Sequence, residues 1–440
     1  MATTVGLISL GCSKNRVDSE QMLAVLKEHG YQIVSDPSRA EVIIVNTCGF
    51  IQSAKEEAIS TLFEMAGYKQ TGCCRLLVAT GCFAQRYPEA IREEMPEVDV
   101  IMGVNDYQKL DEALREAEKG GRPVYTDDDG QFHEFGRVLT TPKYSAYVRI
   151  GEGCDNWCSY CAIPMIRGGY RSRTMESIEE EARGLVENGA KELILIAQDT
   201  TRYGIDLYGE YSLAKLMRRL CKIDGLKWLR VLYCYPDALT DELLETMAEE
   251  EKIVKYIDLP LQHASARVLK RMNRTGDRES LTALMKKIRE KIPGVTLRTT
   301  LITGFPGETE EEFTELAEFV KDIEFERLGC FAYSQEEGTP AALMPDQIDD
   351  EVKNHRAEII MESQMNIMDR LGEKQVGRDI TVLTEGFDRY AECWFGRSAM
   401  DAPDIDGKVF FSAETKPYYG EMVMVHVDEA IDGDLFGTRV

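Results

Sequence analysis

Three cysteines close together in the sequence, Cys154, Cys158 and Cys161, are the strongest chemical signal in the chain. They follow a short apolar run at residues 146–150, which predicts a strand, so we expect them on the loop after it. Thiolates favour iron–sulfur clusters or zinc. A closed structural zinc site needs four ligands, and this motif supplies three. A 4Fe–4S cluster with one iron left open is therefore the preferred interpretation, and a zinc knuckle or unligated thiols are the alternatives.

Three further cysteines, Cys12, Cys48 and Cys82, are separated by 35 and then 33 residues. Each follows the carboxyl end of a predicted parallel strand, where open α/β sheets gather their ligands. Glycines at positions 11 and 81 would let the backbone turn sharply beside a cofactor. A second cluster is the preferred interpretation. Ordinary buried cysteines are the alternative, because free cysteine is often buried. The remaining six cysteines share no spacing and are expected to be structural: Cys73, Cys74, Cys221, Cys234, Cys330 and Cys393.

Other positions at predicted strand ends are weaker candidates for binding a cofactor. Gln198 and Asp199 end the second strand of the central region, and Gly304 and Gly307 form a glycine turn after the fifth. Either pair is also compatible with a plain turn between a strand and a helix.

Two more groups of polar residues have open interpretations. Gln262 and His263 end the fourth central strand; they are expected to face a cavity, with a structural histidine as the alternative. Arg167, Arg171 and Arg173 form a local basic cluster. They are expected either to pair with a substrate carboxylate or to bridge acidic helices such as residues 176–181.

The surrounding segments alternate between strand and helix patterns. In the first third of the chain, apolar runs predict strands at residues 5–10, 41–45, 75–79 and 98–102, and periodic segments predict helices at 16–29, 53–64 and 85–94. Such an alternation predicts a parallel sheet covered on both faces. From residue 144 a second series predicts strands at 146–150, 192–197, 228–233, 256–259, 296–303 and 327–332. Six consecutive βα units predict a partial or complete βα barrel, with its chemistry at the carboxyl ends of the strands.

The end of the chain has a different pattern. One long helix is predicted over residues 349–371, followed by period-two segments that predict a small β-barrel. The predicted organisation is an N-terminal domain at 3–118, a linker at 119–139, a central domain at 140–371 and a terminal barrel at 372–440. A length of 440 residues agrees with several domains.

Charge limits the choice of partner. The chain has 52 basic and 77 acidic residues, a net charge of −25, which disfavours bare nucleic acid as a partner. No apolar run approaches the roughly 18 residues that span a bilayer, and no signal-peptide core follows the amino terminus. We therefore expect a cytoplasmic protein without membrane partners. In that reducing compartment, clustered cysteines indicate metal or redox sites rather than disulfides.

The chain resembles the methylthiotransferase family of radical S-adenosylmethionine enzymes over essentially its whole length. The motifs that carry the resemblance are Gly-Cys-Ser-Lys-Asn-Arg-Val-Asp-Ser-Glu at 11–20, Cys-Ala-Ile-Pro-Met-Ile-Arg-Gly-Gly-Tyr-Arg-Ser-Arg at 161–173, and Asp-Ala-Pro-Asp-Ile-Asp-Gly at 401–407. They are most similar to the branch that modifies a ribosomal protein; the branch that modifies transfer RNA prefers a Val-Pro-Tyr-Thr-Arg-Gly-like run. All six clustered cysteines fit the family pattern.

The resemblance implies a radical core and a terminal TRAM domain. It implies that Cys154, Cys158 and Cys161 hold a cluster whose open iron binds S-adenosylmethionine, and that Cys12, Cys48 and Cys82 hold an auxiliary 4Fe–4S cluster carrying the sulfur. One S-adenosylmethionine would methylate that sulfur and a second would supply a 5′-deoxyadenosyl radical. The implied substrate is the β-carbon of one aspartate in the twelfth protein of the small ribosomal subunit. An electron donor and a sulfur source are also implied, and the sequence identifies neither.

Two other functions remain open. The first is methylthiolation of a transfer RNA adenosine, and the second is an iron–sulfur scaffold or electron carrier without transferase activity. Residues 371–440 carry seven Lys/Arg and fourteen Asp/Glu, a balance of −7. An RNA-binding barrel is expected to be basic. The acidic barrel therefore favours a basic protein substrate. An electron carrier needs no substrate cavity, so the predicted βα repeats favour an enzyme.

Overall fold

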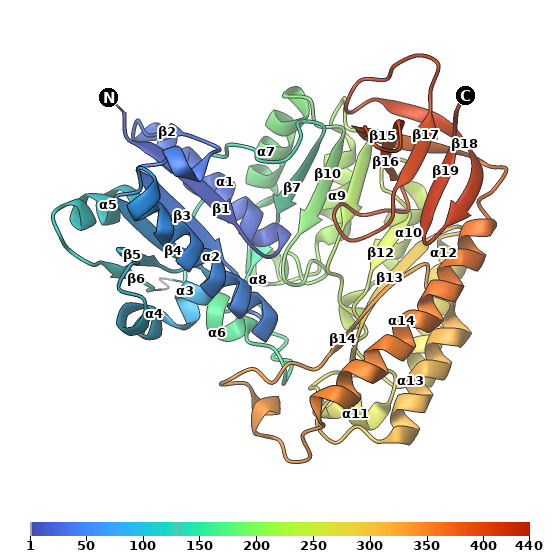
Figure 1. The fold of residues 1–440 in the computed structure, drawn as a ribbon. Helices are drawn as coiled ribbons and strands as arrows, with labels where there is room; N and C mark the ends of the chain where they lie inside the picture. The colour runs from blue at the N-terminus through green and yellow to red at the C-terminus, as the bar shows by residue number, and fades with distance from the viewer. Residues whose placement is uncertain (1, 128–129, 135) are drawn as a thin grey trace.

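The structure is a computed structural model that describes residues 2–127, 130–134 and 136–440. Figure 1 shows the N-terminal α/β domain in blue, the central α/β domain in green and yellow, and a red β-barrel above the long final helix. The fold class expected from the sequence is confirmed, because a parallel sheet, a partial βα barrel and a closed β-barrel follow one another along the chain. The domain limits given above stay predictions.

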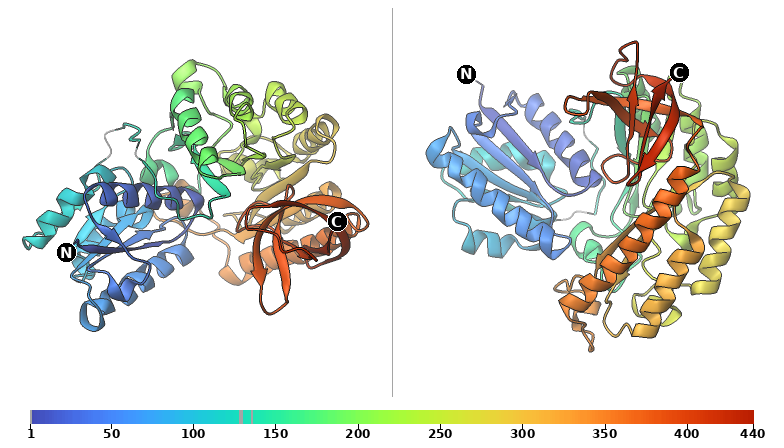
Figure 2. Two further views of the ribbon diagram at one scale, coloured as in Figure 1. Left: turned by 90° about the horizontal axis from the view of Figure 1, so that it is seen from above. Right: turned by 45° about the vertical axis from the view of Figure 1, so that its right-hand side comes forward.

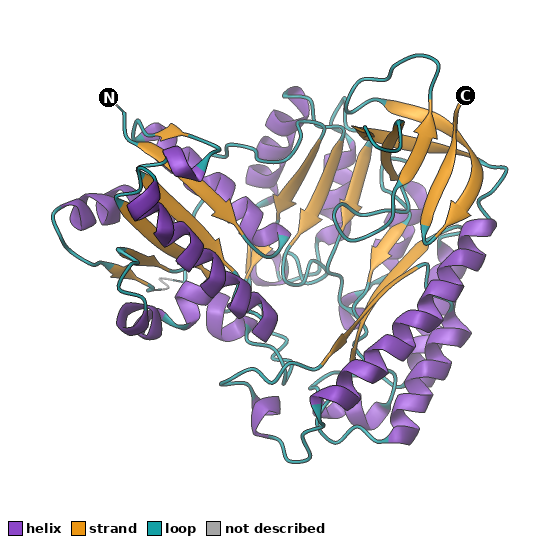
Figure 3. Ribbon diagram, viewed as in Figure 1, coloured by secondary structure: helices purple, strands orange, loops and turns teal. Residues whose placement is uncertain are grey.

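The N-terminal domain is built on a parallel sheet with the strand order β2-β1-β3-β4-β5-β6. The strands are β1 (Thr4–Ser9), β2 (Gln32–Ile33), β3 (Val42–Thr47), β4 (Leu76–Gly81), β5 (Val100–Met102) and β6 (Val124–Tyr125). The helices are α1 (Ser13–Glu28), α2 (Gln52–Thr71), α3 (Cys82–Arg86), α4 (Pro88–Glu94) and α5 (Leu110–Glu118), with 3-10 turns η1 (Pro37–Arg39) and η2 (Tyr107–Lys109). Helices lie on both faces of this sheet (Figure 3). Because one apolar cluster lies on each face, β3 and β4 are buried throughout.

One helix predicted from the sequence is divided in the structure. The prediction of a single helix at 85–94 is wrong, because α3 ends at Arg86 and α4 begins at Pro88. Tyr87 between them has a φ of −131°. The residue before a proline is disfavoured in the α conformation, so the proline sets the boundary.

The segment predicted as a linker at 119–139 is attached to both neighbouring domains. Its β6 extends the N-terminal sheet beside β5. The buried Arg137 forms ion pairs with Glu20 of α1 and with Glu181 in the central domain. Residues 128, 129 and 135 of this predicted linker lie outside the described residues. The described part of the segment therefore contributes to the contact between the domains.

The central domain is a partial barrel of parallel strands, each near its predicted position. They are β7 (Ser145–Arg149), β10 (Glu192–Ile196), β11 (Trp228–Val231), β12 (Tyr256–Asp258), β13 (Thr296–Thr303) and β14 (Arg327–Ala332). Ladders join β7 to β10 to β11, and β12 to β13 to β14. The amide of Cys234 donates to the carbonyl of Asp258 at 2.9 Å and connects the two halves. Among the described residues no ladder joins β14 to β7, so the barrel is open on that side.

Helices cover the outside of this partial barrel, as the two views of Figure 2 show. They are α7 (Met175–Glu187), α8 (Ile205–Tyr208), α9 (Leu213–Cys221), α10 (Asp241–Glu249), α11 (Ala266–Arg271), α12 (Arg278–Lys291), α13 (Glu310–Ile323) and α14 (Asp350–Glu373). Short elements complete the domain: β8 (Gly151–Glu152), β9 (Arg171–Ser172), α6 (Ile163–Arg167), η3 (Pro236–Ala238) and η4 (Pro340–Leu343). Capping boxes at Asp277 and Thr309 fix the first turns of α12 and α13. No helix among the described residues is long and apolar enough to cross a membrane.

The chain ends in a closed barrel with the strand order β15-β16-β17-β19-β18. Its strands are β15 (Asp379–Asp388), β16 (Cys393–Ser398), β17 (Val409–Ser412), β18 (Met422–Ile431) and β19 (Asp434–Arg439). Alternate residues of these strands, such as Val409, Phe411 and Val425, fill the interior. The predicted terminal β-barrel is therefore confirmed.

The loop at residues 401–407, one of the motifs recognised in the sequence, attaches the terminal barrel to the central domain. Asp401 pairs with Arg327 at 2.5 Å, and Asp406 accepts a hydrogen bond of 2.6 Å from the hydroxyl of Tyr256. Both partners are the first residues of their strands, β14 and β12. The terminal barrel thus packs against the amino ends of the central strands. The first group of cysteines lies beyond the carboxyl end of β7.

Candidate metal centre

The first group of cysteines lies on the loop between β8 and α6. The amide of Cys154 donates to the carbonyl of Gly168 at 3.1 Å, and the amide of Cys161 donates to the carbonyl of Cys158 at 3.0 Å. Gly153 has a φ of 75°, and a Cβ at this position would lie 2.0 Å from the carbonyl oxygen of Gly169. The glycine is therefore required for the chain to enter the cysteine loop.

A buried arginine that the sequence analysis did not single out lies beside this loop. Arg274 donates from Nη1 to Cys158 Sγ at 3.8 Å, and its guanidinium lies 4.2 Å from the ring centroid of Tyr235. Burial raises the pKa of the Cys161 thiol to about 12 and that of Cys154 to about 11. Ionisation of these thiols is therefore unfavourable unless a metal or a nearby cation stabilises the thiolates. Arg274 is such a cation, but it lies 116 residues from Cys158 in sequence, and no local pattern marked it.

The second group of cysteines lies at the carboxyl ends of three neighbouring strands. Cys12 follows β1 as the N-cap of α1, Cys48 follows β3, and Cys82 follows β4 as the first residue of α3. Gly11 has a φ of 81°, and a Cβ there would lie 2.8 Å from the Cβ of Cys48. Gly81 has a φ of 89°, and a Cβ there would lie 2.2 Å from an oxygen of the Asn46 side chain. The two glycines thus permit a close approach of the three strand ends.

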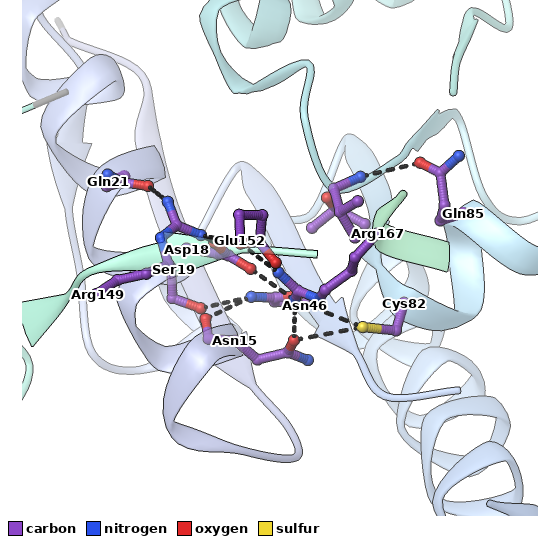
Figure 4. Close-up of polar contacts among 12 residues, drawn as sticks. Asn15, Asp18, Ser19, Gln21, Asn46, Cys82, Gln85, Arg149, Glu152 and Arg167 are labelled. Carbon is purple, nitrogen blue, oxygen red and sulfur yellow. Dashed lines mark hydrogen bonds and ion pairs between the residues drawn. The ribbon is translucent and has the colours of Figure 1, made fainter. Parts of the chain in front are cut away.

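Groups around the buried Cys82 shift the pKa of its thiol in opposite directions. Burial raises the pKa of the Cys82 thiol to about 12; Arg167 lowers it, and Cys12 and Cys48 raise it further. Arg167 Nη2 lies 3.5 Å from Cys82 Sγ, and Asn15 Oδ1 lies 3.6 Å from it (Figure 4). Ionised thiolates at the three positions would therefore repel one another, and shared positive charge would stabilise them.

The structure corrects the prediction for Arg167. It was expected to pair with a substrate carboxylate or to bridge acidic helices, but its side chain is 2% exposed. It pairs with Asp18 of α1 at 2.9 Å and with Glu152 of β8 at 3.0 Å. Arg149 of β7 pairs with the same two carboxylates (Figure 4). This network, Asp18–Arg149–Glu152–Arg167, lies inside the contact between the N-terminal and central domains.

The other two arginines also make internal contacts. Arg173 is buried, pairs with Glu134 at 3.2 Å, and forms a second ion pair with Glu181 of α7. The prediction that it contacts a substrate carboxylate is therefore wrong, and the alternative of a bridge to the acidic helix is confirmed. Arg171 donates from Nη2 to the carbonyl of Arg167 at 3.1 Å.

Gln198 and Asp199, predicted to contact a cofactor, lie against the first cysteine loop. Gln198 Nε2 donates a hydrogen bond of 2.6 Å to Glu152. Asp199 accepts a hydrogen bond of 2.9 Å from the side chain of Asn156, which lies between Cys154 and Cys158. Both residues therefore help to position the loop, and their contact with a cofactor stays a prediction.

Gly304 and Gly307 both adopt positive φ, 69° and 75°. A Cβ at Gly304 would lie 2.0 Å from Lys353 of α14, and a Cβ at Gly307 would lie 2.6 Å from the guanidinium of Arg271. Close packing against these two side chains explains the glycines. Their predicted approach to a cofactor stays a prediction.

His263 is a fully buried residue with two polar neighbours. Its Nδ1 accepts from the amide of Ser265 at 2.9 Å, and its Nε2 lies 3.3 Å from Glu308. These contacts favour the structural alternative for His263. The neighbouring Gln262 has a φ of 72° and donates its amide to the carbonyl of Thr300 at 2.8 Å, so it continues the strand contact.

All twelve cysteines are free of disulfides. Among the six predicted to be structural, Cys74, Cys221 and Cys234 are buried, Cys330 and Cys393 are half-buried, and Cys73 is exposed. Within the described ranges no three His, Cys, Asp or Glu side chains could together hold a single metal ion. Free thiols in two groups of three, each with an arginine beside one sulfur, are a suitable donor set for iron–sulfur clusters.

Known proteins match the chain along its whole length. Residues 4–103 match the model described as uncharacterized protein family UPF0004, residues 148–320 the radical SAM superfamily, and residues 376–440 the TRAM domain. A Clostridium botulinum protein named ribosomal protein uS12 methylthiotransferase RimO is 49% identical over 436 residues, which cover 99% of this chain and 97% of that protein. The chain belongs to the RimO family. A member from Clostridium acetobutylicum is 50% identical and covers 98% of this chain and 97% of its own length.

Solved structures share the fold at low sequence identity. The radical S-adenosylmethionine methyltransferase TsrM from Kitasatospora setae, with cobalamin and a 4Fe–4S cluster bound, superposes with a TM-score of 0.58 at 16% identity, covering 78% of this chain and 77% of its own. The cobalamin-dependent radical enzyme OxsB superposes with a TM-score of 0.52 at 14% identity, covering 82% and 56%. As a RimO family member, this chain is a methylthiotransferase of the radical SAM superfamily, with an iron–sulfur cluster and S-adenosylmethionine as cofactors.

Proposed function

We propose that this enzyme adds a methylthio group to the β-carbon of an aspartate in ribosomal protein uS12, using two 4Fe–4S clusters. The observation that carries the proposal is the presence of two separate groups of three free thiols. One group lies on the loop after β8 and the other lies at the ends of β1, β3 and β4. The family identity over the whole chain supports the same substrate class.

Each cysteine group would have a separate role in the reaction. Cys154, Cys158 and Cys161 would hold the cluster that binds S-adenosylmethionine, and Cys12, Cys48 and Cys82 would hold the auxiliary cluster. When bound, these groups supply a carbon radical that can open an unactivated C–H bond and the sulfur that replaces the hydrogen. Asp199 keeps the first cysteine loop in place through Asn156. Gln198, predicted to contact S-adenosylmethionine, is oriented by its hydrogen bond to Glu152.

The charge of the molecule supports a basic protein as substrate. The net charge is −25, and the barrel region at 371–440 has twice as many acidic as basic residues. Electrostatic attraction to a basic protein would therefore accelerate encounter, and its effect falls with salt. An electron donor and a sulfur source complete the proposed reaction.

Iron analysis tests the number of clusters. After anaerobic reconstitution we expect about eight irons and eight sulfides per chain, because each 4Fe–4S cluster holds four of each. Replacing Cys12, Cys48 and Cys82 by Ala should leave about four, and replacing Cys154, Cys158 and Cys161 should also leave about four. The matched control replaces Cys74, Cys221 and Cys234, and it should keep the full content. Fewer than about five irons in the unmutated protein would exclude two clusters.

A competition assay tests the substrate. The reconstituted enzyme receives S-adenosylmethionine, reductant and sulfide, with equal amounts of uS12 and unmodified transfer RNA. We expect a mass gain of one methylthio group on a single aspartate of uS12 and none on the RNA. A gain on the RNA alone would replace the proposal with the transfer RNA alternative. No gain on either substrate, with S-adenosylmethionine left uncleaved, would favour an iron–sulfur carrier.

A further inference from the structure

Arg167 is a buried cation shared by both domains that carry cysteines. It is the last residue of α6, which begins directly after the first cysteine loop. Its side chain reaches across the domain contact to the second group of thiols, where Nη2 lies 3.5 Å from Cys82 Sγ and 2.8 Å from Asn15 Oδ1. One side chain therefore connects the helix after Cys161 with the sulfur of Cys82.

The contacts of Arg167 hold its guanidinium in one orientation. Its Nη2 also donates to Asp18 at 2.9 Å, and its Nη1 donates to Glu152 at 3.0 Å. Both carboxylates are buried and are also paired with Arg149. A guanidinium held by two carboxylates on two different elements cannot turn away from the sulfur without breaking charge-assisted hydrogen bonds.

We propose that Arg167 is the positioning residue of the auxiliary cluster, which it holds through a hydrogen bond to the Cys82 sulfur. This inference rests on the proposed function, because it requires a cluster on Cys12, Cys48 and Cys82. A cation that donates to a ligating sulfur withdraws negative charge from the cluster. Hydrogen bonds to the sulfurs and the net local charge are what set the reduction potential of such clusters. Arg167 therefore makes the auxiliary cluster easier to reduce.

The same side chain fixes the relative position of the two cysteine groups. Glu152, which accepts from Arg167, lies two residues before Cys154 and also accepts from Gln198 at 2.6 Å. If Cys82 moved away from the first cysteine loop together with α1, the buried guanidinium of Arg167 would be separated from Asp18 and Asn15. That separation is unfavourable in a protein interior, so the two cluster sites are held as one unit.

The test uses the full chain with Cys154, Cys158 and Cys161 replaced by Ala, so that only the auxiliary cluster is loaded. Arg167→Gln removes the charge, and Arg167→Lys keeps the charge but loses the paired donors. Arg173→Gln is the matched control, since Arg173 is also a buried arginine. Its ion pairs are with Glu134 and Glu181, and its contact with the Arg167 network is a hydrogen bond to the carbonyl of Arg149. The measurements are iron per chain, the midpoint potential of the cluster followed by its electron paramagnetic resonance signal, and the melting temperature.

We expect Arg167→Gln to shift the midpoint potential to a more negative value, Arg167→Lys to shift it less, and Arg173→Gln to leave it at the parent value. Loss of the cluster from Arg167→Gln alone, at the parent melting temperature, also supports the proposal. An unchanged potential in Arg167→Gln, or an equal shift in Arg173→Gln, overturns it. If Arg167→Gln does not fold, Arg167→Lys decides by the same criterion. Absence of iron from the parent background would instead be a failure of the two-cluster function.

Discussion

At the scale of residues, the two cysteine groups share one feature, a buried arginine near a sulfur. Arg167 lies beside Cys82 and Arg274 lies beside Cys158. Burial makes thiolates costly, and a fixed cation offsets that cost without competing for the ligand positions. In both groups an arginine is therefore already in place to stabilise a cysteine in its ionised form, which is the form that binds a metal.

Replacing Arg274 by Gln is expected to weaken the cluster that we propose on Cys154, Cys158 and Cys161. The sulfur of Cys158 would lose a cationic donor, and the half-buried ring of Tyr235 would lose its stacking partner. The variant should hold fewer irons after reconstitution and lose them faster on exposure to air. Iron analysis over time measures this effect.

The control for this prediction is Arg356→Gln. Arg356 is equally buried, but its side chain pairs with Glu308 and Glu310 rather than with a cysteine. It should lower stability but keep the iron content. Equal iron loss in both variants would show that Arg274 acts only through stability.

At the scale of elements, the terminal barrel is attached to the central domain by buried ion pairs as well as by the loop at 401–407. Glu192 of β10 pairs with Arg230 of β11 at 2.9 Å and with Arg397 of β16 at 2.6 Å. The two domains also share one apolar cluster there, in which Leu383 and Ala402 pack with Tyr256 and Trp228. The barrel is therefore a fixed part of the molecule.

This contact predicts a pH dependence of stability. Burial alone would raise the pKa of Glu192, but Arg397 and Arg230 lower it from 4.5 to about 2. Because the pKa in the folded state is lower than in the unfolded state, the stabilisation is complete above about pH 4.5 and is lost as the pH falls toward about 2. Glu192→Gln should lose about 3–5 kcal/mol at neutral pH, because two buried arginines lose their partner.

Denaturant unfolding between pH 7 and pH 3 tests this expectation. The unmutated protein should lose stability on acidification more steeply than Glu192→Gln, because the variant lacks this titrating carboxyl. Glu385→Gln serves as a second variant, because Glu385 pairs with Arg397 at 2.8 Å but its pKa is raised by burial. A parallel pH dependence in the unmutated protein and Glu192→Gln would contradict the assignment.

At the scale of the whole molecule, the N-terminal domain is joined to the central domain on two sides. One side is the buried network around α1, and the other is Glu336, which pairs with Arg86 at 2.6 Å and with Lys55 at 3.0 Å. Glu336 follows β14, the last strand of the open barrel. The N-terminal domain is thus held to the central domain by two separate sets of buried ion pairs.

Replacing Glu336 by Gln should loosen the second of these contacts. Two basic groups would lose a buried carboxylate, so opening of this contact should become easier by about 1–3 kcal/mol. Faster hydrogen exchange in α2 and in residues 334–338 would report it. Glu337→Gln is the control, because the Glu337 side chain is exposed and only its carbonyl accepts from Arg86. Equal exchange in the two variants would contradict the role of Glu336.

The sequence predicted well what depends on local patterns. Apolar runs located β3, β4 and the central strands, and the spacing of Cys154 to Cys161 identified the first thiol group. The role of Arg167 was missed, because its partner Asp18 lies 149 residues away. Helix α1 shows the same limit. Its apolar residues predicted an ordinary amphipathic helix, but it also buries Asp18 and Glu20, since α1 contacts the sheet on one side and β7 on the other. Periodicity describes one helix and does not reveal which distant segment will cover its polar face.

The position of α1 between two domains has a consequence for the order of biosynthesis. Asp18 and Glu20 leave the ribosome long before Arg137, Arg149 and Arg167, which are their partners in the finished protein. The 85 residues from Cys82 to Arg167 take about 4–17 s to translate at ordinary rates. During that interval Cys12, Cys48 and Cys82 have been translated, but Arg167 has not. Loading of the proposed auxiliary cluster is therefore expected to follow translation of the first cysteine loop and α6, so that both proposed metal sites mature together.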